Sequence, residues 1–241
     1  MNLVLDLGNT RIKAALFHAS ELVEKSTFPS TTALLSFLEQ HQFEHAIVSS
    51  VNQSADEILR AVNVTGKKFK LKAAMPLPIK NHYATPDTLG VDRLAGACGA
   101  FHLFPNSDCL VVDAGTCINY EFINKHGHYL GGAISPGITM RFEAMHKFTA
   151  RLPLVHFTID THVPMIGDST ETCMQSGVGN GVVAEVDGTI EKYITNYPDL
   201  VVILCGGDAA LFENRLKHRI FVAPDLILKG LNSILLYNVS I

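Results

Sequence analysis

Two stretches of this chain, about a hundred residues apart, follow the same short pattern. In residues 3–10 a hydrophobic run ends in Asp, and Gly and Thr follow; residues 109–116 repeat this order. Each stretch predicts a strand that ends in a tight turn, and the apolar residues after each turn predict a second strand. The repeat therefore predicts two similar lobes, residues 1–106 and 107–241, with a cleft between them.

The rest of the chain alternates between patterns typical of strands and of helices, which predicts an α/β fold. Residues 74–92 are rich in proline and glycine and predict a loop. The other predicted elements are strands at 46–51 and 200–204 and helices at 31–40, 54–62 and 94–103.

Composition excludes several classes of protein. With 47% hydrophobic and 17% charged residues, the chain has ample apolar material for a core. Its formal net charge of -4 argues against a nucleic-acid partner, which normally requires a basic face. No apolar run reaches the ~18 residues of a membrane span, and the N-terminus lacks the basic start of a signal peptide. Five cysteines without a Cys-x-x-Cys pair fit reduced thiols, so we expect a cytoplasmic protein.

The first turn has the chemistry of a phosphate site. A glycine-centred turn between two strands exposes consecutive backbone N–H groups, which bind anions. Thr10 can add a hydroxyl and Lys13 a positive charge, while Asp6 can hold the water shell of Mg²⁺. Taken alone, the turn is explained equally well as a hairpin with a solvated tip.

The second turn and a later glycine pair favour a nucleotide site. Residues 113–116 would place a phosphate-type turn in the other lobe, and Gly206 and Gly207 follow a strand where a flat base can lie against bare backbone. This set matches the actin-like and sugar-kinase ATPases, which have two ribonuclease H-like lobes with ATP in the cleft between them. The chain lacks a P-loop, and we interpret the glycine run 177–181 as close helix packing.

Asp92 is the candidate catalytic base. Phosphoryl transfer to an alcohol requires a carboxylate that accepts the hydroxyl proton. Asp92 precedes a predicted helix, and the planar guanidinium of Arg93 can bind an anionic group of a substrate. In isolation, the two residues are better explained as a helix N-cap and a solvated first-turn residue, since Asp is a preferred N-cap.

Taken in order, these motifs resemble the type III pantothenate kinases, and the resemblance covers essentially the whole chain. Residues 117–120 depart from the family pattern, which affects none of the candidate site residues. The resemblance rests on Asp6-x-Gly8-Asn9-Thr10-x-x-Lys13, Asn81-x-Tyr83, Gly90-x-Asp92-Arg93, Asp113-Ala114-Gly115-Thr116, and residues 131–137, 149–153, 169–171 and 175–177.

The resemblance implies an enzyme that phosphorylates the primary hydroxyl of pantothenate with ATP, the first step of coenzyme A biosynthesis. It implies Mg²⁺ with ATP, a monovalent cation (K⁺ or NH₄⁺) at Asp113, and Asp92 as proton acceptor. The residues implied to bind ATP are Asp6, Leu7, Gly8, Asn9, Thr10, Arg11, Ile12, Lys13 and Thr116. Those implied to bind pantothenate are Tyr83, Gly90, Val91, Asp92, Arg93 and Thr170.

The resemblance also implies a homodimer whose partner subunit helps to close the pantothenate pocket. Residues 133–153 carry more large apolar side chains than a small lobe needs, including Phe142, Met145 and Phe148 at helical spacing. Thr170 lies far along the chain from Asp92, which contact across an interface would explain. The alternatives are that the apolar residues form ordinary core and that Thr170 reaches the site within its own chain.

Two other functions stay open. A nucleotide-binding regulatory protein on the same fold would not need a carboxylate at Asp92. A kinase for another small alcohol, such as a sugar, would usually have several Asn, Asp and Glu side chains at the substrate, and residues 80–93 have few. The histidines do not predict a zinc site, because neither His41 with His45 nor His126 with His128 has a neighbouring Cys or carboxylate cluster.

Overall fold

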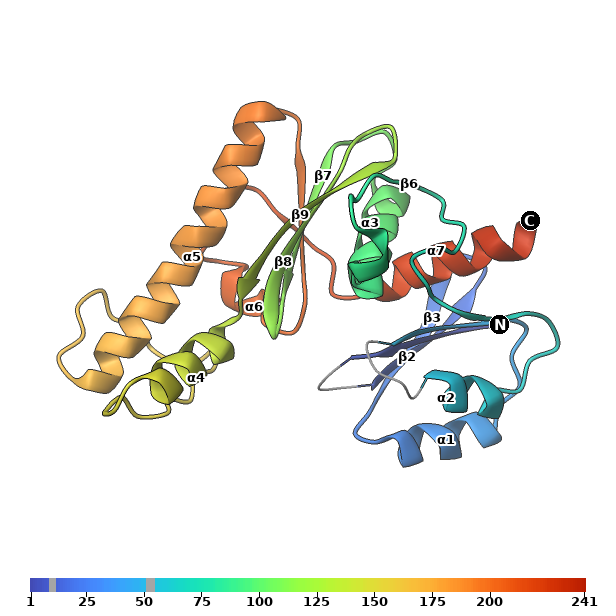
Figure 1. Cartoon of the computed structure of the whole chain (residues 1–241), viewed down its shortest axis with the longest axis horizontal. Coiled ribbons are helices and arrows are strands. Elements are labelled where there is room, and N and C mark those ends of the chain that lie inside the picture. Colours follow the sequence, from blue (N-terminus) through green and yellow to red (C-terminus); the bar gives the residue numbers. More distant parts are fainter. Residues whose placement is uncertain (9–11, 51–54) are drawn as a thin grey trace. The chain divides into compact units, whose positions relative to one another are not determined.

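A computed structural model describes residues 1–8, 12–50 and 55–241. The described chain divides into two compact units (Figure 1). Both contain strands and helices, which confirms the predicted α/β class. The first unit comprises Met1–Asn106, Ile123–Leu130 and Asp225–Ile241, and the second comprises Ser107–Phe122 and Gly131–Pro224.

The division differs from the predicted lobes in two segments. Ile123–Leu130 and Asp225–Ile241 were expected in the second lobe, whereas their contacts place them in the first unit. The C-terminal segment forms α7 (Leu226–Ser240), which packs against α3 (Val91–Leu103).

Glycines allow α3 and α7 to approach closely. A Cβ atom on Gly230 of α7 would overlap the carbonyl oxygen of Ala95, and one on Gly99 of α3 would overlap that of Leu226. Larger residues at these positions would force the helices apart, because neither backbone could move aside cheaply. The small residues at the crossing therefore allow the C-terminal helix to pack closely within the first unit.

In the first unit, β1 lies inside a sheet of order β3-β2-β1-β4-β5. It pairs antiparallel with β2 and parallel with β4. Two further elements of this unit, β6 and a short 3₁₀ turn, η1, lie within the predicted loop. The bounds are β1 (Asn2–Leu7), β2 (Ile12–His18), β3 (Glu21–Phe28), α1 (Thr31–Glu39), β4 (Ala46–Ser50), α2 (Ala55–Ala61), β5 (Lys68–Lys70), β6 (Lys80–Asn81) and η1 (Pro86–Thr88).

The two faces of this sheet are covered by different helices. Leu3, Leu5 and Leu7 of β1 share a buried cluster with residues of α1 and α2. Because side chains alternate along a strand, Asp6 points to the opposite face. Helix α7 contacts β1 and β4 on that face, and α3 contacts β4 (Figure 1). Asp6 and the helices α3 and α7 therefore lie on the same side of this sheet.

The second unit is built on a sheet of order β11-β10-β7-β8-β9-β6, to which the first unit contributes β6 and the residues of β9 that pair with it. Within it, β7 and β10 pair in parallel. The bounds are β7 (Cys109–Ala114), β8 (Cys117–Ile123), β9 (His128–Pro136), α4 (Ile138–Phe148), α5 (Thr170–Asn196), β10 (Val201–Cys205), α6 (Ala209–Phe212) and β11 (Phe221–Val222).

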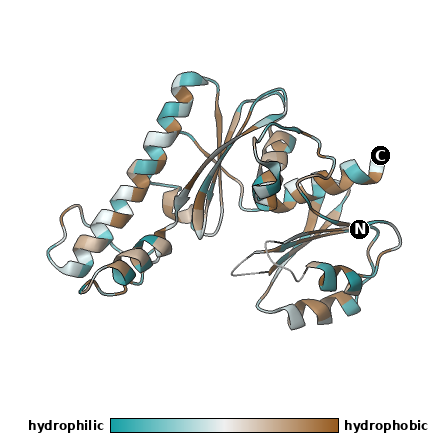
Figure 2. Ribbon diagram, in the orientation of Figure 1, coloured by the Kyte–Doolittle hydropathy of each residue, from teal (hydrophilic) through white to brown (hydrophobic). Residues whose placement is uncertain are grey.

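Helix α5 is amphipathic, with hydrophobic and hydrophilic residues alternating along its length (Figure 2). Its buried apolar residues recur every fourth position, which places them on one stripe of the helix. The stripe consists of Met174, Val178, Val182, Val186 and Ile190. Within the described ranges, no helix is long and apolar enough to cross a bilayer.

The glycine run 177–181 lies inside α5, and close packing explains only its central member. A Cβ atom on Gly179 would lie 2.8 Å from Val163 Cγ1, so a side chain there would displace the loop before the helix. A Cβ atom on Gly177 or Gly181 would have no atom within 4 Å. The interpretation as close helix packing is therefore wrong for the two outer glycines.

Candidate active site

The strands on either side of the first turn, β1 and β2, pair with each other. Leu7 pairs with Ile12, and Asp6 lies opposite Lys13, so the carboxylate and the ammonium group belong to the same face of the sheet. Of the expected ATP-binding residues, Asp6, Leu7, Gly8, Ile12 and Lys13 are described. Asn9, Thr10 and Arg11 lie outside the described residues.

Asp6 also lies at the carboxyl end of a parallel strand pair. Its partner in β4 is Ser49, whose hydroxyl is buried and has no hydrogen-bond partner among the described residues. Ligands of α/β sheets commonly bind beyond the carboxyl ends of parallel strands. Asp6 and Ser49 thus give this edge two oxygen groups on one face.

Asp92 lies in the first turn of α3, not at its N-cap. The helix begins at Val91, and Gly90 occupies the N-cap position without a side-chain bond. Asp92 Oδ1 accepts a hydrogen bond of 2.9 Å from the backbone N–H of Arg93. A Cβ atom on Gly90 would lie 2.6 Å from that oxygen, so glycine leaves room for the carboxylate. The expectation that Asp92 is the N-cap is therefore wrong, although Asp92 does bind a first-turn amide.

Arg93 is buried against an aromatic pair. Arg93 is only 8% exposed, so the alternative that it is a solvated first-turn residue is wrong. The guanidinium lies over the ring of Tyr83, which stacks on Tyr129 with ring centroids 6.3 Å apart. Sequence reasoning missed Tyr129, because the only signal for it is the parallel pairing of β6 with β9 that puts the rings together.

The substrate residues expected near the start of α3 therefore come together. Tyr83, Gly90, Val91, Asp92 and Arg93 all lie in the first unit, on the loop over 81–90 and the first turn of α3. The loop is held by its own polar groups, since the Tyr83 N–H donates to Asn81 Oδ1 at 2.9 Å. Together with Tyr129, they bring one carboxylate, one guanidinium and two aromatic rings to the start of α3.

The second turn packs against Gly206, the first residue of the later glycine pair. Asp113, in β7, pairs with Cys205 at the end of β10. Gly206 follows with a φ of +95°, and a Cβ atom there would lie 2.5 Å from Asp113 Oδ1 and overlap the carbonyl oxygen of Ala114. The Asp208 N–H donates to the same carbonyl at 2.9 Å. A glycine is required here both by the backbone conformation and by the close approach.

Gly207 borders a small cavity of about 190 Å³. Asp208 borders it too, and burial raises the pKa of its carboxyl group above the ordinary value. The cavity is lined by Ile138, Thr139, Phe157, Thr158, Ile159, Gly207, Asp208, Ala210 and Leu211. Its mixture of apolar walls and a few polar groups suits a flat heterocycle. That Gly206 and Gly207 bind a base stays a prediction.

Thr170 lies elsewhere in the second unit, at the first turn of α5. The helix is capped by Ser169, whose side chain bonds the N–H of Thr172 while Thr172 bonds back to Ser169 N. Thr170 is exposed and borders a cavity of about 850 Å³. The cavity is lined by Arg141, Met145, Leu152, Gly167, Asp168, Ser169, Thr170, Cys173, Met174, Gly177 and Val178.

Comparison with known proteins settles the family. A family model described as type III pantothenate kinase matches residues 2–192. The chain belongs to the type III pantothenate kinases. Among this family, a protein from Bacteroides fragilis is 43% identical over 241 residues, covering 99% of this chain and 98% of its own. One from Christiangramia forsetii is 43% identical over 242 residues, covering 99% of both chains.

Solved structures place this type III pantothenate kinase among the actin-like ATPases in fold. A Campylobacter jejuni protein described as a Baf family transcriptional activator superposes with a TM-score of 0.65 at 21% identity, covering 99% of this chain and 100% of its own. A glucokinase from an Antarctic psychrotroph superposes with a TM-score of 0.53 at 15% identity, covering 98% and 99%. The predicted fold, family and enzyme class, a kinase, are confirmed.

Proposed function

We propose that this kinase transfers the γ-phosphoryl group of ATP to the primary hydroxyl of pantothenate, giving 4'-phosphopantothenate in the first step of coenzyme A biosynthesis. The family membership supports the reaction. The observation that carries the site is the placement of Asp92 next to a buried Arg93 that is stacked on an aromatic pair.

Asp92 acts as the proton acceptor in this proposal. It takes the proton from the hydroxyl of pantothenate while that oxygen forms a bond to the γ-phosphorus and the bond to the bridging oxygen of ADP breaks. The hydrogen bond from the Arg93 N–H uses only one oxygen, Oδ1, and holds the carboxylate in one orientation. Oδ2 is then the natural acceptor for the proton.

Arg93 and Tyr83 hold pantothenate. The substrate carries a carboxylate, and a guanidinium binds a carboxylate through two parallel hydrogen bonds. Because Arg93 is already fixed by the Tyr83 ring, less conformational entropy is lost when the substrate binds. Gly90 and Val91 supply the backbone beside the reacting hydroxyl.

The residues for the phosphates and cations lie on both turns. Asp6 suits Mg²⁺, which takes one or two carboxylates and otherwise water and phosphate oxygens. Asp113 suits K⁺ or NH₄⁺. Its carboxylate and the carbonyl oxygen of Ala114 both lie next to Gly206, which has no side chain, and a cation of this kind binds to oxygen atoms. These cations offset the negative charge of the phosphates; Lys13 and Thr116 contact ATP directly.

A homodimer in the cytoplasm completes the proposal, with Thr170 contacting pantothenate bound to the partner subunit. Of the apolar stripe on α4, Phe142 is buried in the core, whereas Phe148 is 80% exposed. Met165 and Ile166, just before α5, are 84% and 85% exposed. Exposed apolar residues of this size favour a protein contact surface.

The decisive experiment measures pantothenate-dependent ADP release by the purified protein with ATP, Mg²⁺ and K⁺. Glucose and N-acetylglucosamine serve as control acceptors. Of the three acceptors, we expect pantothenate to be the one that stimulates ADP release. If a sugar stimulates ADP release and pantothenate does not, the acceptor is a sugar. If the protein binds nucleotide but no acceptor stimulates ADP release, the regulatory alternative is favoured.

A further inference from the structure

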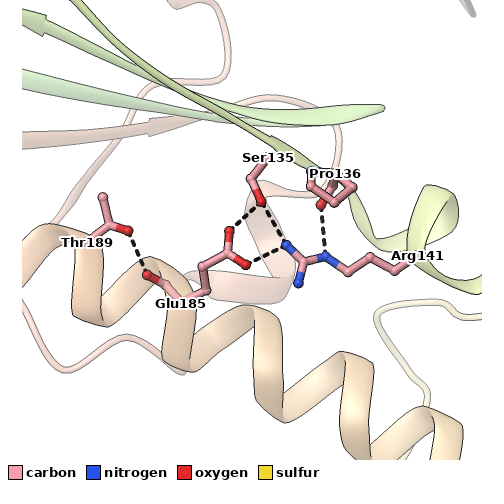
Figure 3. Close-up of polar contacts among 5 residues, drawn as sticks. All are labelled: Ser135, Pro136, Arg141, Glu185 and Thr189. Atoms are coloured by element: carbon pink, nitrogen blue, oxygen red, sulfur yellow. Dashed lines mark hydrogen bonds and ion pairs between the residues drawn. The ribbon is translucent and has the colours of Figure 1, made fainter.

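A polar network joins three elements of the second unit (Figure 3). Arg141, on α4, donates from Nε to the carbonyl oxygen of Pro136 at 2.8 Å. Its Nη2 donates to Glu185 Oε2 at 2.7 Å and to Ser135 Oγ at 3.0 Å. Ser135, at the end of β9, donates in turn to Glu185 Oε1. Both oxygens of one carboxylate on α5 and two nitrogens of one guanidinium are therefore used.

The network holds residues 135–137, whose backbone packs against the second turn. Gly137 follows Pro136 directly, and its N–H donates to the carbonyl oxygen of Thr116 at 3.1 Å. A Cβ atom on Gly137 would overlap the carbonyl oxygens of Gly115 and Thr116, so the two backbones are in contact. Any shift of Pro136 would displace the surface on which Thr116 rests.

The network is also placed where it can resist such a shift. The side chains of Arg141 and Glu185 are 19% and 34% exposed. Partial burial weakens the competition from water, and charge-assisted hydrogen bonds in such a site are shorter and stronger than neutral ones. An ion pair that served only to tie α4 to α5 would not need the further bonds to Ser135 and Pro136.

We propose that Arg141 and Glu185 are positioning residues for the phosphate turn at residues 113–116, acting through the backbone of residues 135–137. They do not contact ATP. They fix the positions of Thr116 and Asp113, which in the proposed function bind ATP and the monovalent cation. The inference rests on the proposed binding of ATP at this turn.

The test compares steady-state kinetics of Glu185→Gln and Arg141→Lys in the full-length enzyme. We expect kcat/KM for ATP to fall by about 10- to 100-fold, because small misplacements of a binding group are this costly. In Glu185→Gln, KM for pantothenate should change by less than about twofold. Glu185 does not line the cavity that Arg141 and Thr170 border, and Thr170 lies about 22 Å from Glu185 along α5 at 1.5 Å per residue.

Arg141→Lys separates positioning from simple stabilisation. A lysine keeps the positive charge beside Glu185, but a single ammonium group cannot reproduce the fork that binds Pro136 and Glu185 together. For a positioning residue the lysine variant should lose nearly as much activity toward ATP as Arg141→Gln. For a mere tie between two helices the lysine should restore most of it.

Glu191→Gln is the matched control. Glu191 lies on the same helix and forms an ion pair with His218 at 2.8 Å, so the variant removes one carboxylate charge from α5 without touching the network. Its kcat/KM for ATP should stay within about twofold of wild type. An equal loss in this control would assign the effect to α5 in general and overturn the inference.

Wild-type kinetics for ATP in Glu185→Gln and Arg141→Lys would also overturn it. If Glu185→Gln does not fold, Ser135→Ala, which leaves the ion pair intact, is read by the same criterion. If the wild type shows no pantothenate-dependent ADP release, the proposed function fails separately. Hydrogen exchange of the Gly115 and Gly137 amides then tests the network: we expect faster exchange in the variants, and unchanged exchange would contradict it.

Discussion

The guanidinium of Arg93 lies over the ring of Tyr83, with Cζ 5.4 Å from the ring centroid. Arg93 Nη1 also donates a long hydrogen bond to Tyr83 Oη at 3.5 Å. Tyr83 comes from the loop before α3 and Arg93 from its first turn, so the contact orders the loop next to Asp92.

Replacing Tyr83 by Ala should raise KM for pantothenate by at least about 2- to 5-fold, because a cation–π contact contributes about 0.5–1 kcal/mol at an exposed site and more where the cation is buried, as Arg93 is. Tyr83→Phe keeps the ring over Arg93 and should stay within about twofold of wild type. Steady-state kinetics with varied pantothenate measures both. The neighbouring His82→Ala is the control, and an unchanged KM in Tyr83→Ala would remove the ring from the proposed pantothenate site.

Asp92→Asn should lower kcat by about 10²- to 10⁴-fold, the usual contribution of a general base, and leave ATP binding nearly intact. The asparagine side-chain oxygen can still accept from the Arg93 N–H, so the start of α3 should keep its conformation. The matched control is Asp87→Asn, an exposed carboxylate in η1 of the same loop. Turnover and ATP affinity are measured separately; near wild-type turnover would reduce Asp92 to a residue that binds a first-turn amide.

Gly206→Ala should reduce both stability and ATP affinity, whereas Gly207→Ala should affect stability little. Gly206 has a φ of +95°, a conformation that costs other residues about 1–3 kcal/mol. A Cβ atom on Gly207 would have no atom within 4 Å. Urea denaturation and ATP titration of the two variants check this. Equal stability of both would show that the loop after β10 relaxes without cost.

Activity should depend on K⁺ or NH₄⁺ through Asp113. At constant ionic strength, replacing KCl by the salt of a large organic cation should lower turnover, because the phosphates lose a neutralising charge. Asp113→Asn should show low turnover in both salts. Equal rates of the wild type in both salts would remove the cation from the mechanism and leave the kinase reaction intact.

Mixing inactive Asp92→Asn and Thr170→Val subunits should restore part of the activity. If Thr170 contacts pantothenate across a two-fold interface, one site of the mixed dimer carries both changes and the other carries neither. The mixture is assayed after exchange of subunits, and each variant alone is the control. Mixed dimers that form and stay as inactive as the parents would show that Thr170 acts within its own chain.

The sequence alone determined the local features of this protein. Residues 2–7 and 109–116 predicted strands that end in Asp-x-Gly turns, because hydrophobic patterning and turn-forming residues are properties of neighbouring positions in the chain. The ordered motifs then pointed to the family and to Asp92, Arg93 and Asp113. The predicted bounds of α1 differ from the observed ones by one residue, and β4 begins at the predicted residue, since their apolar patterns are regular; the predicted end of that strand, residue 51, lies outside the described residues.

The tertiary structure decided the contacts between distant segments. It joined α7 to α3, stacked Tyr129 on Tyr83, buried Arg93, and linked Arg141 to Glu185 across 44 residues. None of these leaves a local pattern, because each depends on which surfaces are complementary once the strands have paired. A glycine that permits a helix crossing looks, in the sequence, like the glycines at 177 and 181, beside which there is only open space.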